Sequence, residues 1–402
     1  MAVVADSSVV EILCEVHFAH LTSALKELAI SGVLTDITFV CEDGTLQAHQ
    51  VVVSAFSGSL RQISSSSGHK SCVFIINAKK KIVQALLHFL YQGYTCISKH
   101  EFEALTEAAS TLKLDCFTQT QLEYVDDNLY LRFPDHERLL RENLQCLRSS
   151  HNLCDVVFVT EELSRVYSHA CIMATCSRML QSVLMSHRRN NDGPCVLVLE
   201  GVKLEHILPI LDFCYHGSAS MTQEIVCETH CVARLMEMDY ICEILATVDD
   251  PLSITTNVSS PKSQVTNTVR LMDMISEPGN GRDSFRNFQR ILSHLASTES
   301  LTDVTFLKDG RCLRAHSVLL CAFGPYFKEL EEKLGHDLKE AVVLVRSLSG
   351  SLLQSYLDYL YRGEAQFSGS PKEFCELMSN WIDFSLLPAD DSTLLPCDGK
   401  PY

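Results

Sequence analysis

Apolar and polar positions follow the same order three times along this chain of 402 residues. The order is clearest in the last copy, where an opening helix is predicted from the helical spacing of Phe288, Ile291, Leu292 and Leu295. Alternation at residues 304–306 then predicts a strand. Lys308-Asp309-Gly310 predicts a hairpin turn, which leads into a second strand ending at His316. A short apolar helix is expected next.

The second half of each copy is predicted to contain a strand and two helices. Residues 72–76, 195–199 and 341–345 are continuous apolar runs, which are typical of strands covered on both faces. The helix after each run is expected to end at a glycine, because glycine accepts the left-handed backbone common after helix ends. These glycines are Gly93, Gly217 and Gly363. A further helical segment completes each copy, so every copy is expected to be an α+β unit with a small sheet and several helices.

Each copy also places an aspartate and a histidine at the same two points of this pattern. The pairs are Asp36 with His49, Asp155 with His169, and Asp303 with His316. An aspartate beside a histidine can serve in acid–base catalysis. However, no serine or cysteine nucleophile recurs at a fixed place with these pairs, and each pair brackets a predicted hairpin. We therefore interpret these residues as structural and expect no enzymatic activity and no cofactor.

Taken together, these motifs resemble a known family. The order Leu-x-Asp-[Val/Ile]-x-Phe, hairpin, histidine, apolar helix, strand and Tyr-x-Gly is similar to that of the BTB (POZ) domain, over residues 34–112, 153–238 and 301–381. The segment Tyr130-Leu131-Arg132-Phe133 resembles the aromatic-rich strand of the tramtrack and bric-a-brac group, with Phe133 in place of the usual tryptophan. The resemblance implies three tandem BTB-like domains.

Composition between the motifs suggests where these domains begin and end. We expect domains at residues 8–118, 129–248 and 284–388, called repeats one, two and three below. A short connection at 119–128 joins the first two. Residues 249–283 hold few apolar side chains and are expected to be a flexible linker, and 389–402 a C-terminal tail.

Charge and cysteine usage exclude several classes of function. The formal net charge of −17 disfavours direct nucleic-acid binding, which depends on Lys and Arg neutralising phosphates. Many of the 18 cysteines lie in apolar runs and are interpreted as buried core residues. Cys227 and Cys231 flank His230 but lack the second ligand pair of a zinc finger, so no metal is expected. No leader or membrane-spanning run is recognised, which suggests a soluble intracellular protein without a membrane or small-molecule partner.

The resemblance points to an interaction surface. In BTB domains the opening helix and the strand before it form an exchanged dimer interface, so the candidate interface residues are Tyr130, Leu131, Phe133, Leu21, Leu25, Phe288 and Leu292. The alternative for the first three is a linker that packs on its own domain. Because repeats one and two are closely joined, we expect them to pair within the chain and leave repeat three for another chain.

The family's charged pocket is altered in all three repeats. In BTB dimers of the transcription-factor kind, a Lys or Arg directly after the histidine accompanies the aspartate. Here those positions hold Gln50, Ala170 and Ser317. A buried aspartate without that cation needs backbone or water hydrogen bonds, or its pKa rises.

These features imply a non-enzymatic scaffold that homo- or hetero-oligomerises with protein partners, including other BTB proteins. By resemblance, it takes part in transcriptional regulation in the nucleus, with the cytoplasm as the alternative compartment. A second hypothesis is a substrate adaptor for a cullin-type ubiquitin ligase, whose contacts are Phe327, Glu329, Leu330 and Glu332. A third is a structural protein without a working partner pocket.

Overall fold

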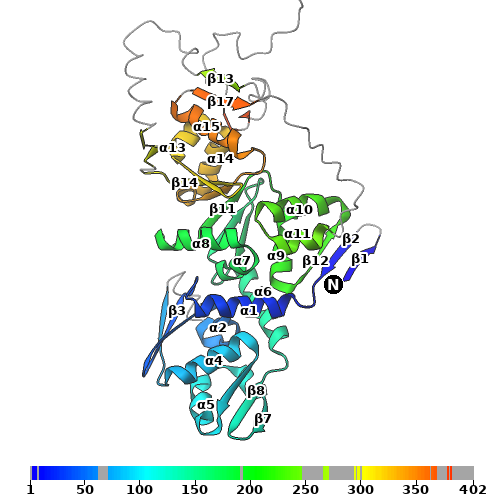
Figure 1. The fold of residues 1–402 in the computed structure, drawn as a ribbon, viewed down its shortest axis with the longest axis vertical. Helices are drawn as coiled ribbons and strands as arrows, with labels where there is room; N and C mark the ends of the chain where they lie inside the picture. Colours follow the sequence, from blue (N-terminus) through cyan, green and yellow to red (C-terminus); the bar gives the residue numbers. More distant parts are fainter. Residues whose placement is uncertain are drawn as a thin grey trace, which may run out of the picture. The chain divides into compact units, whose positions relative to one another are not determined.

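The computed structural model describes residues 2–6, 9–61, 71–190, 193–246, 266–270, 294–295, 297–298, 301–362, 364–368, 378–379 and 381–382 (Figure 1). The chain forms two compact units. Unit 1 contains Met1–Phe158, Arg165–Cys195 and Lys203–Asp250, whereas unit 2 contains Val159–Ser164, Val196–Val202 and Pro251–Tyr402. Unit 2 therefore includes part of repeat two together with repeat three.

Repeat one follows the predicted order of elements. Helix α1 (His17–Ile30) precedes the hairpin of β3 (Ile37–Cys41) and β4 (Gly44–Ala48), and α2 (Gln50–Phe56) follows. Next come β5 (Cys72–Ile75), α4 (Lys80–Gln92), β6 (Tyr94–Ser98) and α5 (Phe102–Thr111). In the sheet order β4-β3-β5, β3 is antiparallel to β4 and parallel to β5.

Repeat two contains these elements in the same order, together with the helices α8 and α11. They are α6 (His136–Ser149), β9 (Val156–Val159), β10 (Arg165–Ser168), α7 (Ala170–Cys176), α8 (Arg178–Asn190), β11 (Cys195–Leu199), α9 (Leu204–His216), β12 (Ser218–Thr222), α10 (Val226–Leu235) and α11 (Asp239–Ala246). Helices α4 and α9 end as expected, because Gly93 and Gly217 have φ of 77° and 71°.

Repeat three is described from its hairpin onward. Its elements are β14 (Val304–Lys308), β15 (Arg311–Ala315), α13 (Ser317–Phe323), α14 (Pro325–Leu334), β16 (Val342–Leu344), α15 (Gly350–Arg362) and β17 (Glu364–Ser368). Most of the opening helix expected at 288–295, including Phe288 and Leu292, lies outside the described residues, as does Gly363.

Two segments expected to connect domains contain strands. Strand β7 (Gln121–Val125) lies within the range 119–128. Strand β13 (Thr266–Arg270) lies within the range 249–283 and pairs antiparallel with β17. Neither strand was predicted, because Gln121–Val125 was interpreted as part of a short connection and Thr266–Arg270 holds a single apolar residue, Val269.

The apolar runs at residues 72–76, 195–199 and 341–345 were predicted to be strands covered on both faces. This prediction is wrong for β5. All residues of β11 and β16 are buried, whereas burial alternates along β5, and Val73 and Ile75 keep 65% and 78% of their surface exposed. Strand β5 ends its three-stranded sheet. In unit 2, by contrast, β16 lies between β14 and β11 and pairs in parallel with both.

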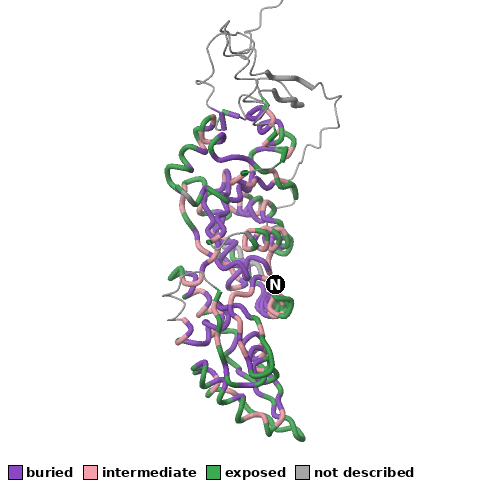
Figure 2. The backbone as a smooth tube through the Cα atoms, turned by 90° about the vertical axis from the view of Figure 1, so that its left-hand side faces the viewer, coloured by how far each residue is buried: buried purple, intermediate pink, exposed green. Residues whose placement is uncertain are grey.

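The core of each unit is formed by the predicted apolar positions (Figure 2). Phe39 and Phe89 are fully buried in unit 1, and Phe306 and Trp381 in unit 2. Several cysteines expected in the core are also buried, namely Cys41, Cys154, Cys171 and Cys214. Cys176 and Cys321 are only partly covered, and Cys375 lies outside the described residues.

Candidate functional site

Repeats one and two of unit 1 exchange the strands that precede their first helices. Strand β2 (Val9–Leu13), which leads into α1, pairs antiparallel with β12 of repeat two. Strand β8 (Asn128–Arg132), which leads into α6, pairs antiparallel with β6 of repeat one. β1 (Ala2–Asp6) and β7 extend these sheets, giving β1-β2-β12 and β6-β8-β7. Each repeat is therefore completed by backbone hydrogen bonds from the other.

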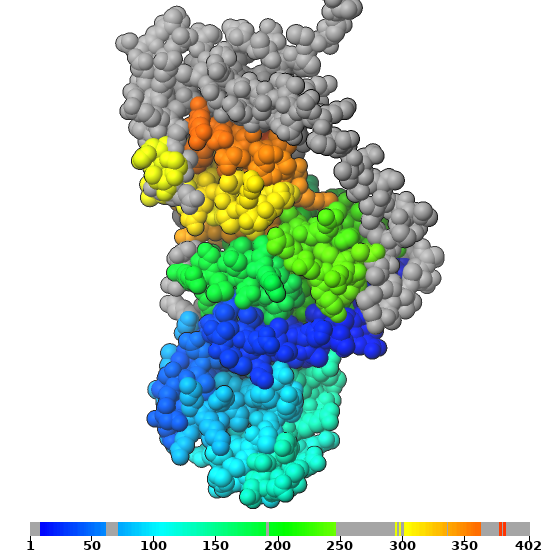
Figure 3. Space-filling model, viewed as in Figure 1, coloured from blue at the N-terminus to red at the C-terminus, as the bar shows by residue number. Residues whose placement is uncertain are grey.

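The helices after these strands follow the same exchange. Helix α1 contacts α4 of its own repeat and α7 of repeat two, while α6 contacts α9 of its own repeat and α2 of repeat one. In Figure 3 the dark blue N-terminal segment lies against the green residues of repeat two. Burial of two long helix faces is a large apolar contribution, at roughly 25 cal/mol per Å² of apolar surface.

A matched histidine–glycine contact closes each side of the exchange. His17, at the start of α1, reaches the backbone oxygen of Cys214 with Nε2 at 3.0 Å, and its ring lies against Gly217. His136, at the start of α6, reaches the backbone oxygen of Leu90 at 2.8 Å and lies against Gly93. Burial lowers the pKa of both histidines, so both are neutral donors near pH 7.

Sequence reasoning did not identify these two histidines. A Cβ added at Gly93 or Gly217 would lie only 2.7 or 2.8 Å from the facing histidine side chain. Each glycine therefore ends its helix and also leaves room for the histidine of the other repeat. The paired signal in the sequence is a histidine four residues after the end of the exchanged strand, His17 after β2 and His136 after β8.

Among the candidate interface residues, Leu131 and Phe133 are buried, as are Leu21 and Leu25 on α1. Tyr130 keeps 45% of its surface exposed. Phe133 donates its backbone N–H to the oxygen of Gly93 at 2.8 Å, and Cys14 does the same to Gly217. The segment 130–133 therefore lies on repeat one, although it is joined to repeat two.

The recurrent histidine and tyrosine form one hydrogen-bonded cluster per repeat. In repeat one, the His49 backbone N–H donates to the Tyr91 hydroxyl at 2.9 Å, and His49 Nδ1 lies 2.8 Å from the same oxygen. His49 Nε2 lies 3.0 Å from the oxygen of Val33. A carbonyl only accepts, so Nε2 carries the proton and Nδ1 accepts from Tyr91. Burial lowers the pKa of His49 to about 4, which keeps the ring neutral.

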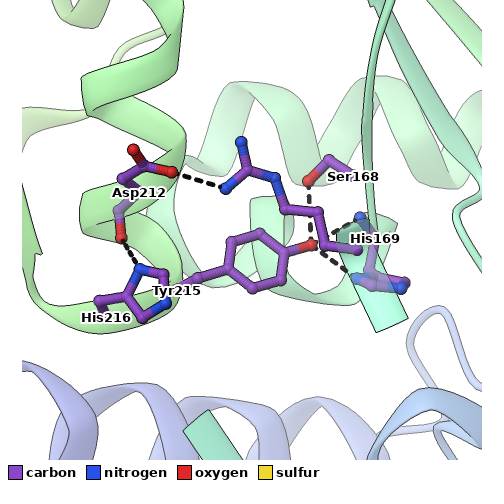
Figure 4. Close-up of polar contacts among 6 residues, drawn as sticks. Ser168, His169, Asp212, Tyr215 and His216 are labelled. Atoms are coloured by element: carbon purple, nitrogen blue, oxygen red, sulfur yellow. Dashed lines mark hydrogen bonds and ion pairs between the residues drawn. The ribbon is translucent and has the colours of Figure 1, made fainter. Parts of the chain in front are cut away.

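The other repeats contain the same cluster. Tyr215 Oη lies 2.6 Å from His169 Nδ1 and also contacts Ser168 at 3.2 Å (Figure 4). In repeat three, Tyr361 Oη lies 2.7 Å from His316 Nδ1. In each case the tyrosine ties the end of the hairpin to the helix that carries it. Because both polar groups of the pair are occupied by each other, the cluster offers no activated nucleophile.

The aspartates hold the start of the next helix. Asp36 Oδ1 accepts from the Gln50 backbone N–H at 2.5 Å, and Asp155 Oδ1 accepts from Ala170 at 2.6 Å. Asp303 accepts both the backbone N–H and the hydroxyl of Ser317, each at 2.6 Å. These contacts satisfy a helix N–H that has no partner within its own helix.

Asp36 also has the raised pKa that is expected for a buried carboxylate without an adjacent cation. Burial raises its pKa to about 7, which the Gln50 hydrogen bond partly opposes, while the charge of Asp155 raises it further. Arg188 of α8 lowers it and donates to the Leu34 oxygen at 2.7 Å. A cation therefore does approach this site, from Arg188 in the last turn of α8.

Repeats one and two differ beside the tyrosine. In repeat two, Arg148 is buried, lies over the Tyr215 ring and donates to Asp212 at 2.9 Å. The same positions of repeat one hold Ala29 and His88. There, a cavity of about 530 Å³ opens between α1, β4 and α4.

The residues proposed for a cullin contact lie on α14. Phe327 and Leu330 are fully buried, and Phe327 packs against Phe306 and Trp381. Glu329 and Glu332 are exposed, and Glu329 lies 3.5 Å from Lys333. The two apolar members of this set are thus core residues. Within the described ranges, no cluster of His, Cys, Asp and Glu could hold a metal ion, and no described helix has the length and apolar character to cross a membrane.

Comparison with known sequences agrees with this geometry. The BTB/POZ domain family model matches residues 25–129, 144–248 and 292–381, which is more than half of the chain. The chain belongs to the BTB/POZ domain family. Its fold is α+β, and BTB/POZ domains mediate protein–protein interactions.

Among the relatives are three proteins of Drosophila melanogaster. Protein tramtrack, alpha isoform, is 36% identical over 78 residues, which cover 19% of this chain and 9% of tramtrack. Longitudinals lacking protein-like is 36% identical over 75 residues, covering 19% of this chain and 58% of that protein. Protein bric-a-brac 1 is 33% identical over 82 residues, which cover 20% of this chain and 8% of that protein. The chain thus matches less than two thirds of the length of each relative.

A solved structure, the BTB domain of zebrafish PATZ1, is 19% identical and covers 25% of this chain and 84% of that chain, with a TM-score of 0.23.

Proposed function

We propose that this protein is a non-enzymatic interaction scaffold that assembles with itself or with other BTB proteins and acts in transcriptional regulation in the nucleus. The observation that carries the proposal is the reciprocal exchange of β2 and β8 in unit 1. Within this chain, two repeats pair by strand addition and helix burial, and this supports the proposal that the same fold also pairs between chains. The relatives tramtrack and bric-a-brac support the regulatory part, since the sequence resembles their group.

The polar clusters favour binding over catalysis. His49, His169 and His316 each share hydrogen bonds with a tyrosine, and the aspartates cap helices. In each cluster the histidine and the tyrosine hydrogen-bond to each other, although Tyr91 also lines the cavity between α1, β4 and α4. The function therefore rests on surfaces, and direct contact with DNA would come from partners.

Proximity labelling in cells tests this proposal. The full chain and a version without repeat three are each fused to a labelling enzyme, and the labelled proteins are identified. The proposal predicts nuclear regulatory proteins, including BTB proteins, around the full chain. A labelled set without nuclear regulators would contradict the regulatory part. Labelling unchanged by loss of repeat three would show that this repeat does not recruit partners.

The cullin-adaptor hypothesis now depends on the exposed Glu329 and Glu332 alone. A cullin pull-down tests it with Glu329→Ala/Glu332→Ala, using Lys328→Ala as the matched surface control. Binding that the double substitution abolishes and the control retains would favour the adaptor. Absence of binding by the unmodified chain favours the scaffold.

A further inference from the structure

Among the strands that the structure describes, β5 has a neighbour on one edge only. Its neighbour is β3, and it ends the sheet β4-β3-β5 among the strands that the structure describes. Edge strands of soluble proteins are usually protected by charges, proline or a bulge. The sequence of β5, Cys72-Val73-Phe74-Ile75, contains none of these protections, and Val73 and Ile75 are exposed.

The corresponding strand of repeat three shows what can cover such an edge. Thr38 pairs with Val73 and Thr305 with Val342, and each threonine lies two residues after its signature aspartate. Val73 and Ile75 therefore occupy the places of Val342 and Leu344. In unit 2 that strand pairs in parallel with β11, the third strand of repeat two, through Leu197–Val342 and Leu199–Leu344.

The strand that pairs with β11, β16, is far more buried than β5. Val342 and Leu344 keep 6% and 1% of their surface, against 65% and 78% for Val73 and Ile75. A parallel strand beside β5 would satisfy its outward N–H and C=O groups and place apolar side chains over these two residues. The third strands of the three repeats are β5, β11 and β16. Because β11 and β16 pair with each other, β5 is the only one of the three that has an unpaired edge among the described strands.

We propose that β5 pairs in parallel with β5 of a second copy of this chain, in the manner of β11 with β16. The partner is a second copy because the edge needs an uncharged strand of matching apolar pattern, and the second copy provides it. This inference rests on the proposed scaffold function and assigns the surface through which two scaffolds join.

Light scattering after size exclusion tests the pairing with the full chain over a concentration series. The unmodified protein is expected to shift from the mass of one chain to that of two. Val73→Lys/Ile75→Lys should stay at the mass of one chain at every concentration, because two charges then face the edge. The matched control is Leu301→Lys/Val318→Lys, at positions 85% and 70% exposed, which should behave as the unmodified protein.

A second measurement does not depend on the folding of the variants. A photo-crosslinking amino acid at Val73 is expected to join two chains, with the cross-linked peptide containing residues 72–75 of the second chain. Cross-links elsewhere, a mass of one chain at all concentrations, or self-association that survives the β5 charges would each overturn the inference. None of these results changes the proximity-labelling outcome. The scaffold function and the β5 pairing are therefore tested by separate experiments.

Discussion

Repeats one and two differ from repeat three in the source of one strand. The strand that follows α4, α9 or α15, namely β6, β12 or β17, receives an antiparallel partner in every repeat. For β6 and β12 that partner comes from the other repeat, whereas β17 receives β13, which lies just before repeat three in the sequence. The same place in the fold can therefore be filled by exchange or from nearby, and the exchange ties two repeats into one unit.

The largest expected effect tests the close contact behind the exchange. Gly217→Val should lower the free energy of unfolding of unit 1 by about 2–5 kcal/mol, because it adds both left-handed strain and a clash with His17. Gly32→Val is the control, since Gly32 has a similar φ of 67° and faces only the movable Gln47 side chain. Chemical denaturation of the full chain measures both. Equal losses would show that the contact with His17 adds nothing.

The next effect concerns Asp36. Its pKa in the folded protein is raised from 3.8 to about 7, so the folded state holds more protons than the unfolded state between these values. Stability from this group is fully present below about pH 4 and is lost as pH rises toward 7. Asp36→Asn should remove that loss and stabilise the protein at pH 7 relative to pH 4 by roughly 1–4 kcal/mol.

Denaturation curves at pH 4, 5.5 and 7 check this prediction. His49, whose folded pKa is about 4, acts in the opposite direction, because the unfolded chain takes up its proton first as pH falls below 6.5. The comparison is therefore between Asp36→Asn and the unmodified protein at each pH, which cancels the His49 contribution. If the free energy of unfolding changed with pH in the same way for Asp36→Asn and for the unmodified protein, the raised pKa of Asp36 would be contradicted.

A smaller effect is expected at the histidines that close the exchange. His136→Phe keeps the ring but removes the hydrogen bond to Leu90, and should cost about 1 kcal/mol. His20→Phe, at an exposed position of α1, is the control and should cost less. Thermal unfolding of the two variants compares them. A larger loss for His20→Phe would argue against the proposed closing role.

The smallest effect is expected for Tyr130→Lys. This side chain lies on the exchanged β8 but is nearly half exposed, so the unfolding midpoint should not change. Leu131→Lys, at the buried neighbouring position, should destabilise the unit strongly. Thermal unfolding again compares the pair, and similar losses would mean that both faces of β8 are covered in solution.

The sequence predicted the repeated α+β fold because its signals are local. The helix-ending glycines and the hairpin at Asp309-Gly310 depend on residues close together in the chain. The clustering of His49 with Tyr91 was not deduced, although both residues were identified, because 42 positions separate them. Fold class thus follows from short-range pattern, whereas side-chain partners do not.

Other features required knowledge of what lies beside a strand. The runs at β5 and β16 are both apolar, yet β16 pairs with β11 and is buried, whereas β5 has no such neighbour among the described strands and exposes Val73 and Ile75. The approach of Arg188 to Asp36 was not predicted, because it joins segments about 150 residues apart. Exposure and electrostatics of this kind depend on tertiary pairing, which a single sequence does not state.

The pairing of β2 with β12 also constrains the order in which unit 1 can fold during synthesis. Strand β2 ends at Leu13, and its partner begins at Ser218, more than 200 residues later. On the ribosome, the first strands therefore emerge long before the segment that will cover them. Repeat one can accept β8 early, but the pairing of β2 with β12 can form only after β12 has been synthesised, and we expect such a long-range pairing to form slowly.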